Sequence, residues 1–276
     1  MSDTRQRPEF KAKYNNYING KFTAPLKGKY LDVISLIDGK VFTQAAQSGK
    51  EDLELAVEAA YDALRPWQKM SVAKRSILLN KIAKKIEDNI EYIKTVQTLD
   101  NSELIHKKAA SDISLAIDHF RYFAGLIRTE EILIAQLDSK IVSIVLCEPL
   151  SVVTRVIPWN FSILLAVWKI APALAAGNTI VLKTTERIPI SILVIIKLIG
   201  SVLPPGVLNI VSGIDIELTN SLKANKTAFG NSSAEEKFPN IYYPSVADHD
   251  DDFFDKAIEG AVLFALNHIL INQNIN

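Results

Sequence analysis

The residues best suited to chemistry stand at three places where an apolar run of the chain ends. They are Pro158-Trp159-Asn160, Lys183-Thr184-Thr185-Glu186 and Ser212-Gly213. In open α/β sheets, ligands bind outside the carboxyl ends of the parallel strands. The arrangement therefore indicates a nucleotide site with a side-chain amide beside it. A plain α/β core with polar corners is the alternative, because fold alone does not determine function and no Gly-x-Gly-x-x-Gly fingerprint is present.

Three β-branched apolar runs and two helix-length segments alternate around these residues. Strands are expected at 152–157, 179–183 and 207–211, and helices at 163–176 and 190–202. Successive strands start about 27 residues apart, a spacing that suits right-handed βαβ crossovers in a parallel sheet. The predicted fold class is therefore α/β, with a Rossmann-like parallel sheet and flanking helices.

The chain before residue 150 is expected to be predominantly helical. Asn19-Gly20 predicts a hairpin tip, since it supplies the positive φ angles of a tight turn, and Asp38-Gly39 predicts a second turn. Ser48, followed by Glu51, predicts a capped helix start. The remaining expectations are helices over 72–89, 90–99 and 102–124, a strand over 140–146 and a break at 148–150.

Composition argues against several classes of function. The 276 residues carry 31 basic and 31 acidic side chains, so no overall field would draw the chain to nucleic acid or to a lipid surface. Cys147 is the only cysteine and there are four histidines, so neither an internal disulfide nor a cysteine-rich metal site is expected. Residues 1–17 lack the pattern of a secretory signal, which makes a cytoplasmic location the expectation.

Three longer motifs carry a resemblance to a known family. They are residues 156–161 (Val-Ile-Pro-Trp-Asn-Phe), residues 168–183 (beginning Trp-Lys-Ile-Ala-Pro-Ala) and residues 203–213 (Leu-Pro-Pro-Gly-Val-Leu-Asn-Ile-Val-Ser-Gly). In this order they resemble the NAD(P)-dependent aldehyde dehydrogenases. Residues 117–125 and 248–257 are most similar to the bacterial acetaldehyde-oxidising type. The resemblance runs from about residue 17 to residue 267 but covers only about the first half of a usual family member.

The resemblance implies a role for each residue of the predicted site. Asn160 would supply the oxyanion hole, while Ile157 and Trp159 would lie beside the cofactor. Lys183 and Glu186 would hold the adenosine ribose hydroxyls, and a glutamate there favours NAD over NADP because it would repel a 2′-phosphate. An ordinary surface ion pair is the alternative for Lys183 and Glu186, and a turn-forming residue is the alternative for Asn160.

The cofactor's phosphate groups would meet Gly213 and Ser232, where the chain departs from the family. Ile214-Asp215 follows Gly213 in place of Phe-Gly, and the added carboxylate would crowd a pyrophosphate. Phe229-Gly230-Asn231-Ser232 corresponds to the family's Phe-Thr-Gly-Ser segment. Phosphate binding is therefore expected to be weakened without being abolished.

Both groups that drive the family's reaction are missing at their expected positions. Ser233 stands where the general-base glutamate should be, and Asn272 stands where the nucleophilic cysteine should be. An amide cannot form the thiohemiacetal from which hydride is transferred. Four other residues could be proposed as substitutes but are not expected to replace these groups, namely Glu235, Glu236, Cys147 and His268.

Together, the resemblance and these departures predict that the chain is a truncated, degenerate N-terminal half of an aldehyde dehydrogenase. Residues 1–130 and 150–232 would form an incomplete cofactor-binding domain, 131–149 an oligomerisation strand segment, and 233–276 a stub of the catalytic domain. An unpaired edge at 140–146 and an uncovered apolar face at 253–266 would favour capture by another chain.

Three functions stay open. The first is an NAD-dependent oxidoreductase that acts on an aldehyde, as the family implies. The second is an NAD-binding module without chemistry. The third is an oligomerisation partner, either in a homo-oligomer or in a mixed oligomer with a full-length aldehyde dehydrogenase.

Overall fold

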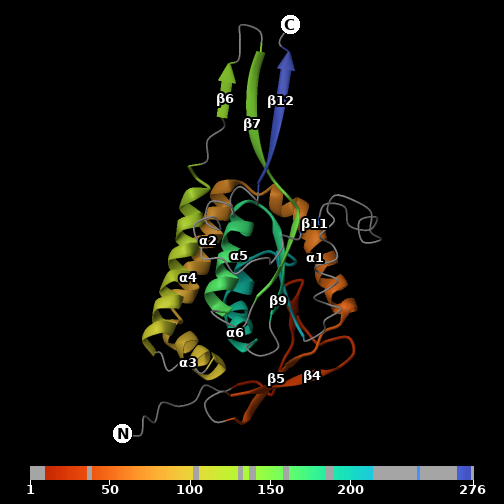
Figure 1. The fold of residues 1–276 in the computed structure, drawn as a ribbon, viewed down its shortest axis with the longest axis vertical. Helices are drawn as coiled ribbons and strands as arrows, with labels where there is room; N and C mark the ends of the chain where they lie inside the picture. The colour runs from red at the N-terminus through yellow and green to blue at the C-terminus, as the bar shows by residue number, and fades with distance from the viewer. Residues whose placement is uncertain are drawn as a thin grey trace, which may run out of the picture.

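The molecule is built around a six-stranded mixed sheet (Figure 1). The structure is a computed structural model that describes residues 10–35, 39–101, 106–129, 133–136, 141–157, 162–184, 189–213, 241–242 and 266–274. The strand order is β11-β8-β9-β10-β2-β3. These strands span Ile241–Tyr242, Val152–Val156, Thr179–Thr184, Leu208–Ser212, Asn16–Ile18 and Lys21–Thr23.

The parallel core predicted from the apolar runs is confirmed. Val152 pairs with Thr179 and Leu208 pairs with Ile180, so β8, β9 and β10 run side by side in one direction. β11 adds in parallel to β8, whereas β2 adds to β10 in the antiparallel direction. Every residue of β9 is buried, as expected for a strand covered on both faces.

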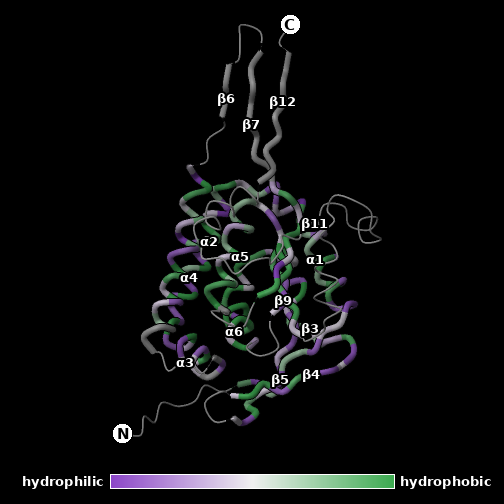
Figure 2. Tube along the Cα trace, viewed as in Figure 1, coloured by the Kyte–Doolittle hydropathy of each residue, from purple (hydrophilic) through white to green (hydrophobic). Residues whose placement is uncertain are grey.

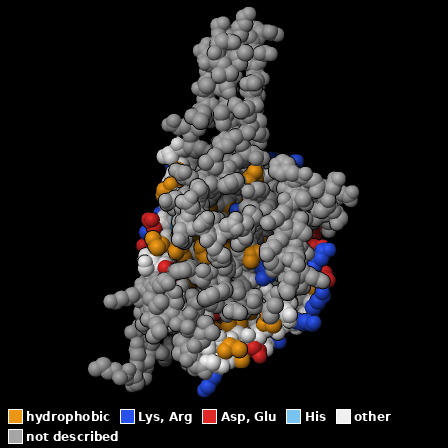
Figure 3. Space-filling view, viewed as in Figure 1, with side chains coloured by type: hydrophobic (Ala, Val, Ile, Leu, Met, Phe, Trp, Pro, Cys, Tyr) orange, Lys and Arg blue, Asp and Glu red, His pale blue; other side chains and the backbone are white. Residues whose placement is uncertain are grey.

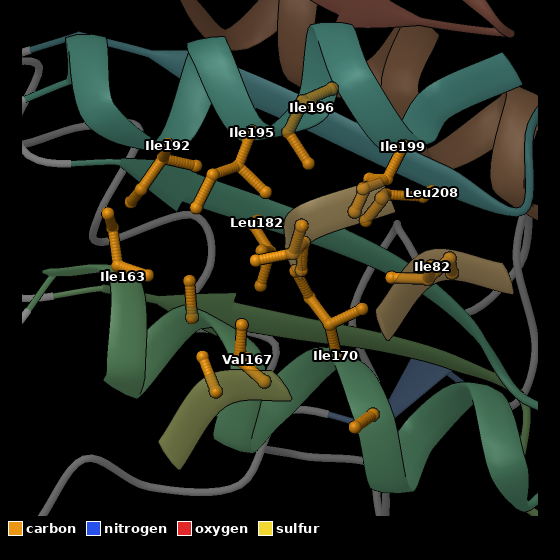
Figure 4. Packing of buried hydrophobic residues seen from close by; sticks show 14 of the residues in the cluster. Ile82, Ile163, Val167, Ile170, Leu182, Ile192, Ile195, Ile196, Ile199 and Leu208 are labelled. Carbon is orange, nitrogen blue, oxygen red and sulfur yellow. The ribbon is translucent and has the colours of Figure 1, made fainter. Parts of the chain in front are cut away.

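Helices cover both faces of this sheet. α1 (Lys50–Gln68) packs against one face through a cluster that includes Ala56, Ala60 and Val181. α5 (Ser162–Ala175) and α6 (Ile190–Ile199) cover the other face, where Leu182 lies between them (Figure 4). Outside these two helices lie α2 (Val72–Glu87), α3 (Ile90–Asn101) and α4 (His106–Leu126).

The distribution of hydropathy follows this layering (Figure 2). Hydrophobic residues dominate α5, α6 and the central strands, while hydrophilic residues line much of α3 and α4. A single 3₁₀ turn, η1 (Gly200–Val202), ends α6 before the turn that leads to β10. The inner helices α5 and α6 lie between the sheet and the outer helices, so protein covers both of their sides. This is why they are apolar almost all round.

The expectation of a predominantly helical chain before residue 150 is confirmed by α1 to α4. The described residues before α1 form strands instead. Besides β2 and β3, this part holds β1 (Lys13–Tyr14), β4 (Tyr30–Ile34) and β5 (Val41–Ala46), which form a sheet in the order β1-β5-β4. The hairpin at Asn19-Gly20 is confirmed by φ angles of 51° and 76°. Gly39 also has a positive φ of 67°, while Asp38 lies outside the described residues.

The first helix is not capped by the residue that the sequence predicts. α1 begins at Lys50 with Gly49 as its N-cap, and the Asp52 carboxylate accepts the Gly49 N–H at 3.0 Å. The hydroxyl of Ser48 instead donates to Asn16 at 2.8 Å, because a buried acceptor from β2 lies within reach. The helix end predicted before Gly125 is placed too early, since α4 continues through it to Leu126.

The strand near residue 140 differs from the expectation in its length and in its pairing. β7 runs over Ile141–Pro149, so the break expected at 148–150 starts later, at Leu150, and separates β7 from β8. β7 pairs with β6 (Leu133–Gln136) on one side and with β12 (Leu266–Asn274) on the other. The expectation of an unpaired edge at 140–146 is therefore wrong, because a segment far along the chain supplies the missing strand. Residues 253–265 lie outside the described residues.

Candidate functional site

The carboxyl ends of three parallel strands meet at one edge of the central sheet. Val156 of β8 and Val211 of β10 both pair with Lys183 of β9. Ile157 follows β8, is 1% exposed and donates its backbone N–H to the Lys183 carbonyl at 2.9 Å. The structure thus brings together three of the residues predicted for the site, namely Ile157, Lys183 and the Ser212-Gly213 corner.

Lys183 and Thr184 give this edge a buried polar character. The Lys183 side chain is 4% exposed, and its Nζ lies 3.5 Å from the Thr184 carbonyl oxygen. The Thr184 hydroxyl shares a hydrogen bond of 2.9 Å with the hydroxyl of Ser212. A buried cation needs polar partners, and the Thr184 carbonyl oxygen is one of them.

Asn16 is the central hydrogen-bonding residue of this edge, although the sequence gives no sign of it. Its Oδ1 accepts the Ser212 N–H at 3.1 Å and the Ser48 hydroxyl at 2.8 Å. The Ser48 N–H donates in turn to the Ser212 carbonyl at 2.8 Å. Asn16 is fully buried, and its Nδ2 has no hydrogen-bond partner among the described residues. These hydrogen bonds connect the end of β10 to Asn16 and to the backbone of Ser48.

A side chain at Gly213 would crowd the backbone of Ser48. A Cβ atom at this position would lie 3.0 Å from both the backbone N and O of Ser48. The backbone just before α1 therefore passes directly against the end of β10. This close approach is a physical reason for glycine here, separate from the phosphate contact that the resemblance implies.

Two asparagines of the longer motifs have structural roles. Asn178 accepts the backbone N–H of Ser151 at 2.9 Å, which joins the chain before β9 to the chain before β8. Asn209 donates through Nδ2 to the Gly206 carbonyl at 2.7 Å and accepts the Asn19 N–H at 3.0 Å. Both side chains satisfy buried backbone groups at turns, so their positions in the motifs reflect folding rather than chemistry.

Several predicted site residues lie outside the described residues. These are Trp159, Asn160, Glu186, Ser232 and Ser233, together with Ile214, Asp215, Glu235 and Glu236. Asn272 lies in β12, where it pairs with Ser143 of β7. Cys147 lies in β7 opposite His268. Asn272, Cys147 and His268 thus belong to the sheet β12-β7-β6 and not to the edge that holds Lys183.

Asp100 is a buried carboxyl group that caps α6. Its Oδ2 accepts hydrogen bonds from the backbone N–H and the hydroxyl of Ser191, both at 2.7 Å. Burial raises the pKa of Asp100 to about 7, although the hydrogen bonds from Ser191 and Ile190 oppose the shift. The folded chain therefore holds a proton here over a pH range in which the unfolded chain has lost it.

We expect Asp100 to make the free energy of unfolding fall as the pH rises from about 4 to about 7, because its pKa increases from 3.8 to about 7 on folding. Each unit of that difference corresponds to about 1.4 kcal/mol. Asp100→Asn should abolish this part of the pH dependence, since an amide can accept the Ser191 N–H without carrying charge. Urea unfolding across the pH range measures it.

Asp62→Asn, on the exposed face of α1, is the matched control for the pH series. The wild-type chain, Asp100→Asn and Asp62→Asn share all their other ionisable groups. The contributions of those groups therefore cancel when the free energies of unfolding are subtracted. Parallel stability curves for the wild-type chain and Asp100→Asn would contradict the assignment.

The described residues give no sign of a metal centre or a membrane span. No group of three or more His, Cys, Asp or Glu side chains among them could hold a metal ion. No helix in the described part is both long and apolar enough to cross a bilayer. Figure 3 shows acidic and basic side chains side by side on the described part of one face. Among the described residues, Lys27 and Glu51 form an ion pair, with their charged atoms 3.2 Å apart.

An open sheet with a parallel core, helices on both faces and polar groups at the carboxyl edge of that core defines the doubly wound α/β class. A model of the aldehyde dehydrogenase family matches residues 22–230. Over 94% of its length the chain is 45% identical to an aldehyde dehydrogenase of Rhodospirillum rubrum and 46% identical to a long-chain-aldehyde dehydrogenase of Acinetobacter. The chain belongs to the aldehyde dehydrogenase family, and it spans 56% of the length of these two relatives.

Solved structures give the same result for the fold. An aldehyde dehydrogenase of Bacillus cereus in complex with NAD⁺ superposes with a TM-score of 0.73 at 32% identity, over 76% of this chain and 43% of that one. A betaine aldehyde dehydrogenase of Staphylococcus aureus, also in complex with NAD⁺, gives a TM-score of 0.72 at 29% identity with the same coverage. The predicted fold class and family are confirmed, and the chain is a fragment relative to these proteins.

Proposed function

We propose that this chain binds NAD at the carboxyl edge of β8, β9 and β10 and does not complete aldehyde oxidation by itself. The observation that carries the proposal is the buried polar edge formed by Lys183, Thr184 and Ser212, held in place by Asn16. The chain's place in its family makes a nicotinamide dinucleotide the ligand to test first.

The described residues fit such a ligand. Ile157 offers an apolar wall, and the Lys183 ammonium offers a donor that matches ribose hydroxyls. Gly213 brings backbone close to the end of β10 without a side chain. When bound, the nicotinamide ring would supply a hydride acceptor. Trp159 and Glu186 are proposed to complete the cofactor contacts, Ser232 to meet the phosphates, and Asn160 to donate its amide to a substrate oxygen.

The proposal that the chain does not complete aldehyde oxidation rests on two residue positions. From the resemblance of the neighbouring motifs we infer that Ser233 stands at the place of the general base and Asn272 at the place of the nucleophile. A serine hydroxyl is a poor base near neutral pH, and a carboxamide does not add to an aldehyde carbonyl. The pairing of Asn272 with Ser143 supports the same view, because it holds this residue in a different sheet from Lys183.

Partnership with a full-length aldehyde dehydrogenase is the second candidate function. Family membership supports it, since members commonly form oligomers. The structure weakens the particular route through β7, because both edges of that strand already pair with strands of the same chain. The aldehyde substrate and a cytoplasmic location remain proposals that follow from the resemblance and the sequence.

The test of the proposed function is NADH formation, followed at 340 nm, by purified chain with acetaldehyde and NAD. The proposal predicts background rates for the wild-type chain, for Asn160→Ala and for Asn272→Cys. Turnover by the wild-type chain that Asn160→Ala abolishes would overturn the proposal, because it would require a nucleophile other than the expected cysteine.

Glu186→Gln tests the proposed preference for NAD. A neutral amide accepts a hydrogen bond from a ribose hydroxyl less strongly than a carboxylate, so NAD affinity should fall about tenfold. NADP affinity should rise, because the repulsion of a 2′-phosphate is removed. Fluorescence titration with both nucleotides measures the ratio.

The matched control for this titration is Glu87→Gln, since Glu87 is a surface residue of α2 that pairs with Arg121 at 2.9 Å. Equal NAD affinities for Glu186→Gln and the wild-type chain would remove Glu186 from the site.

A further inference from the structure

A small pocket lies between the N-terminal strands and α6. It has a volume of about 290 Å³, close to the lower end, about 300 Å³, of the pockets that bind small molecules in proteins. It shares no residue with the site proposed for NAD. Its lining includes Lys11, Lys13, Tyr14, Asn15 and Phe22 from the N-terminal part of the chain and Lys197 from α6.

The charge of this pocket has one sign. Lys11, Lys13 and Lys197 are exposed, and none of the residues that line the pocket is acidic. None of these three lysines forms an ion pair within the part of the chain that the structure describes. The attractions of several cations to one anion add, so the pocket suits an anion that carries two or more charges.

Aromatic rings hold two of the three ammonium groups without neutralising them. The Nζ of Lys11 lies 5.4 Å from the centre of the Phe22 ring, and the Nζ of Lys13 lies 4.4 Å from the centre of the Tyr30 ring. A cation–π contact attracts the ammonium group, but the ring carries no formal charge. Both side chains are therefore partly ordered before a ligand arrives, while their positive charge stays available to it.

Asn15 adds a hydrogen-bond donor to the same pocket. The Tyr30 hydroxyl donates to the Asn15 Oδ1 at 2.8 Å, and no other described residue bonds to the Asn15 side chain. The Nδ2 group is therefore left to donate to a ligand. Tyr30 thus orders two groups of the pocket, because its hydroxyl fixes Asn15 and its ring holds Lys13.

A buried carboxyl group near this pocket does not cancel its charge. Asp100 acts electrostatically on Tyr14, whose pKa is raised mainly by burial. Burial also raises the pKa of Asp100 to about 7, so this carboxyl group is mostly protonated in slightly acidic solution. The net charge that a ligand meets in the pocket therefore remains positive.

We propose that this pocket is a second ligand site, which binds a phosphate or diphosphate group of a small molecule through Lys11, Lys13, Lys197 and the Asn15 amide. The bound group connects the N-terminal strands to α6 and so stabilises the folded chain. The site does not depend on the proposed NAD site, and both can be occupied in one chain.

Calorimetric titration of the full wild-type chain with inorganic pyrophosphate, at constant ionic strength, tests this proposal. We expect saturable binding that persists in the presence of saturating NAD. Lys13→Gln and Lys197→Gln should each weaken pyrophosphate binding about threefold, and the double variant about tenfold, because each removes one exposed charge from the pocket. Lys13→Arg and Lys197→Arg keep the charge and should bind within about twofold of the wild-type chain.

The matched control is the double variant Lys50→Gln with Lys81→Gln, which removes two exposed charges from α1 and α2. It should bind pyrophosphate like the wild-type chain. Three outcomes would overturn the proposal. They are the absence of saturable binding, displacement of pyrophosphate by NAD, and equal affinities for the control and the Lys13→Gln, Lys197→Gln double variant.

If a glutamine variant is unfolded by circular dichroism, lysine acetylation of the wild-type chain decides the question. Pyrophosphate should slow the reaction of Lys11, Lys13 and Lys197 with acetic anhydride, as measured by mass spectrometry, while Lys50 and Lys81 react at unchanged rates. Equal rates with and without pyrophosphate at the three pocket lysines would contradict the proposal.

Discussion

Asn16→Ala is expected to lower the free energy of unfolding by about 3 kcal/mol, because it removes two buried hydrogen bonds and leaves their donors unsatisfied. The donors are the Ser212 N–H and the Ser48 hydroxyl, both of which lie at the end of β10. The same change should weaken NAD binding about tenfold, since Ser212 and Gly213 would lose the contact that fixes them. Urea unfolding and NAD titration measure the two effects separately.

Asn15→Ala is the matched control for this prediction. The Asn15 side chain accepts a hydrogen bond from the Tyr30 hydroxyl at 2.8 Å in a partly buried setting. Its loss should cost about 1 kcal/mol and leave NAD affinity unchanged. Equal losses of stability in the two variants would show that Asn16 is not the central residue of the site edge.

Gly206→Ala is expected to destabilise the chain by about 4 kcal/mol, which combines backbone strain with a steric clash. Gly206 has a φ of 80°, in the left-handed region, and a Cβ atom there would overlap the carbonyl oxygen of Ala59 in α1. Neither the turn before β10 nor α1 can move without disturbing the packing between them. Urea unfolding at a single pH measures the loss.

Gly28→Ala separates the two contributions. Gly28 has a φ of 62°, but nothing lies within 4 Å of its hypothetical Cβ atom. Only the strain of the left-handed backbone applies there, at about 1 kcal/mol. A loss in Gly206→Ala no larger than in Gly28→Ala would mean that α1 yields to the added methyl group.

The parts of the fold that follow from local patterns could be predicted from the sequence. β-branched apolar runs about 27 residues apart predict β8, β9 and β10, and Asn19-Gly20 predicts the β2–β3 turn, because both signals depend on near neighbours. The family motifs point to Ile157, Lys183 and Gly213, which lie at one edge as expected.

The parts that depend on distant segments could not be predicted. Asn16 lies 196 residues from Ser212 in the chain, and no periodicity marks that contact. Ser48 has the residue type and spacing of a helix cap, but the buried Asn16 acceptor takes its hydroxyl, and Asp52 caps Gly49 instead. The resemblance predicts that residues 233–276 form a stub of the catalytic domain, and it gives no sign that residues 266–274 pair with β7 in a sheet apart from the central one.

We propose that this edge of the central sheet binds the cofactor in a chain that lacks the groups that would use it. Lys183 and Ser212 belong to a well-packed sheet that the family match covers. Asn272 lies in a strand beyond that match. We therefore expect the chain to bind the cofactor without completing aldehyde oxidation.

The central claim is tested most directly by calorimetric titration of NAD into the folded wild-type chain. The account predicts saturable binding with one site per chain. A folded chain that shows no saturable binding of NAD would contradict it, and the polar edge around Lys183 would then serve the fold alone.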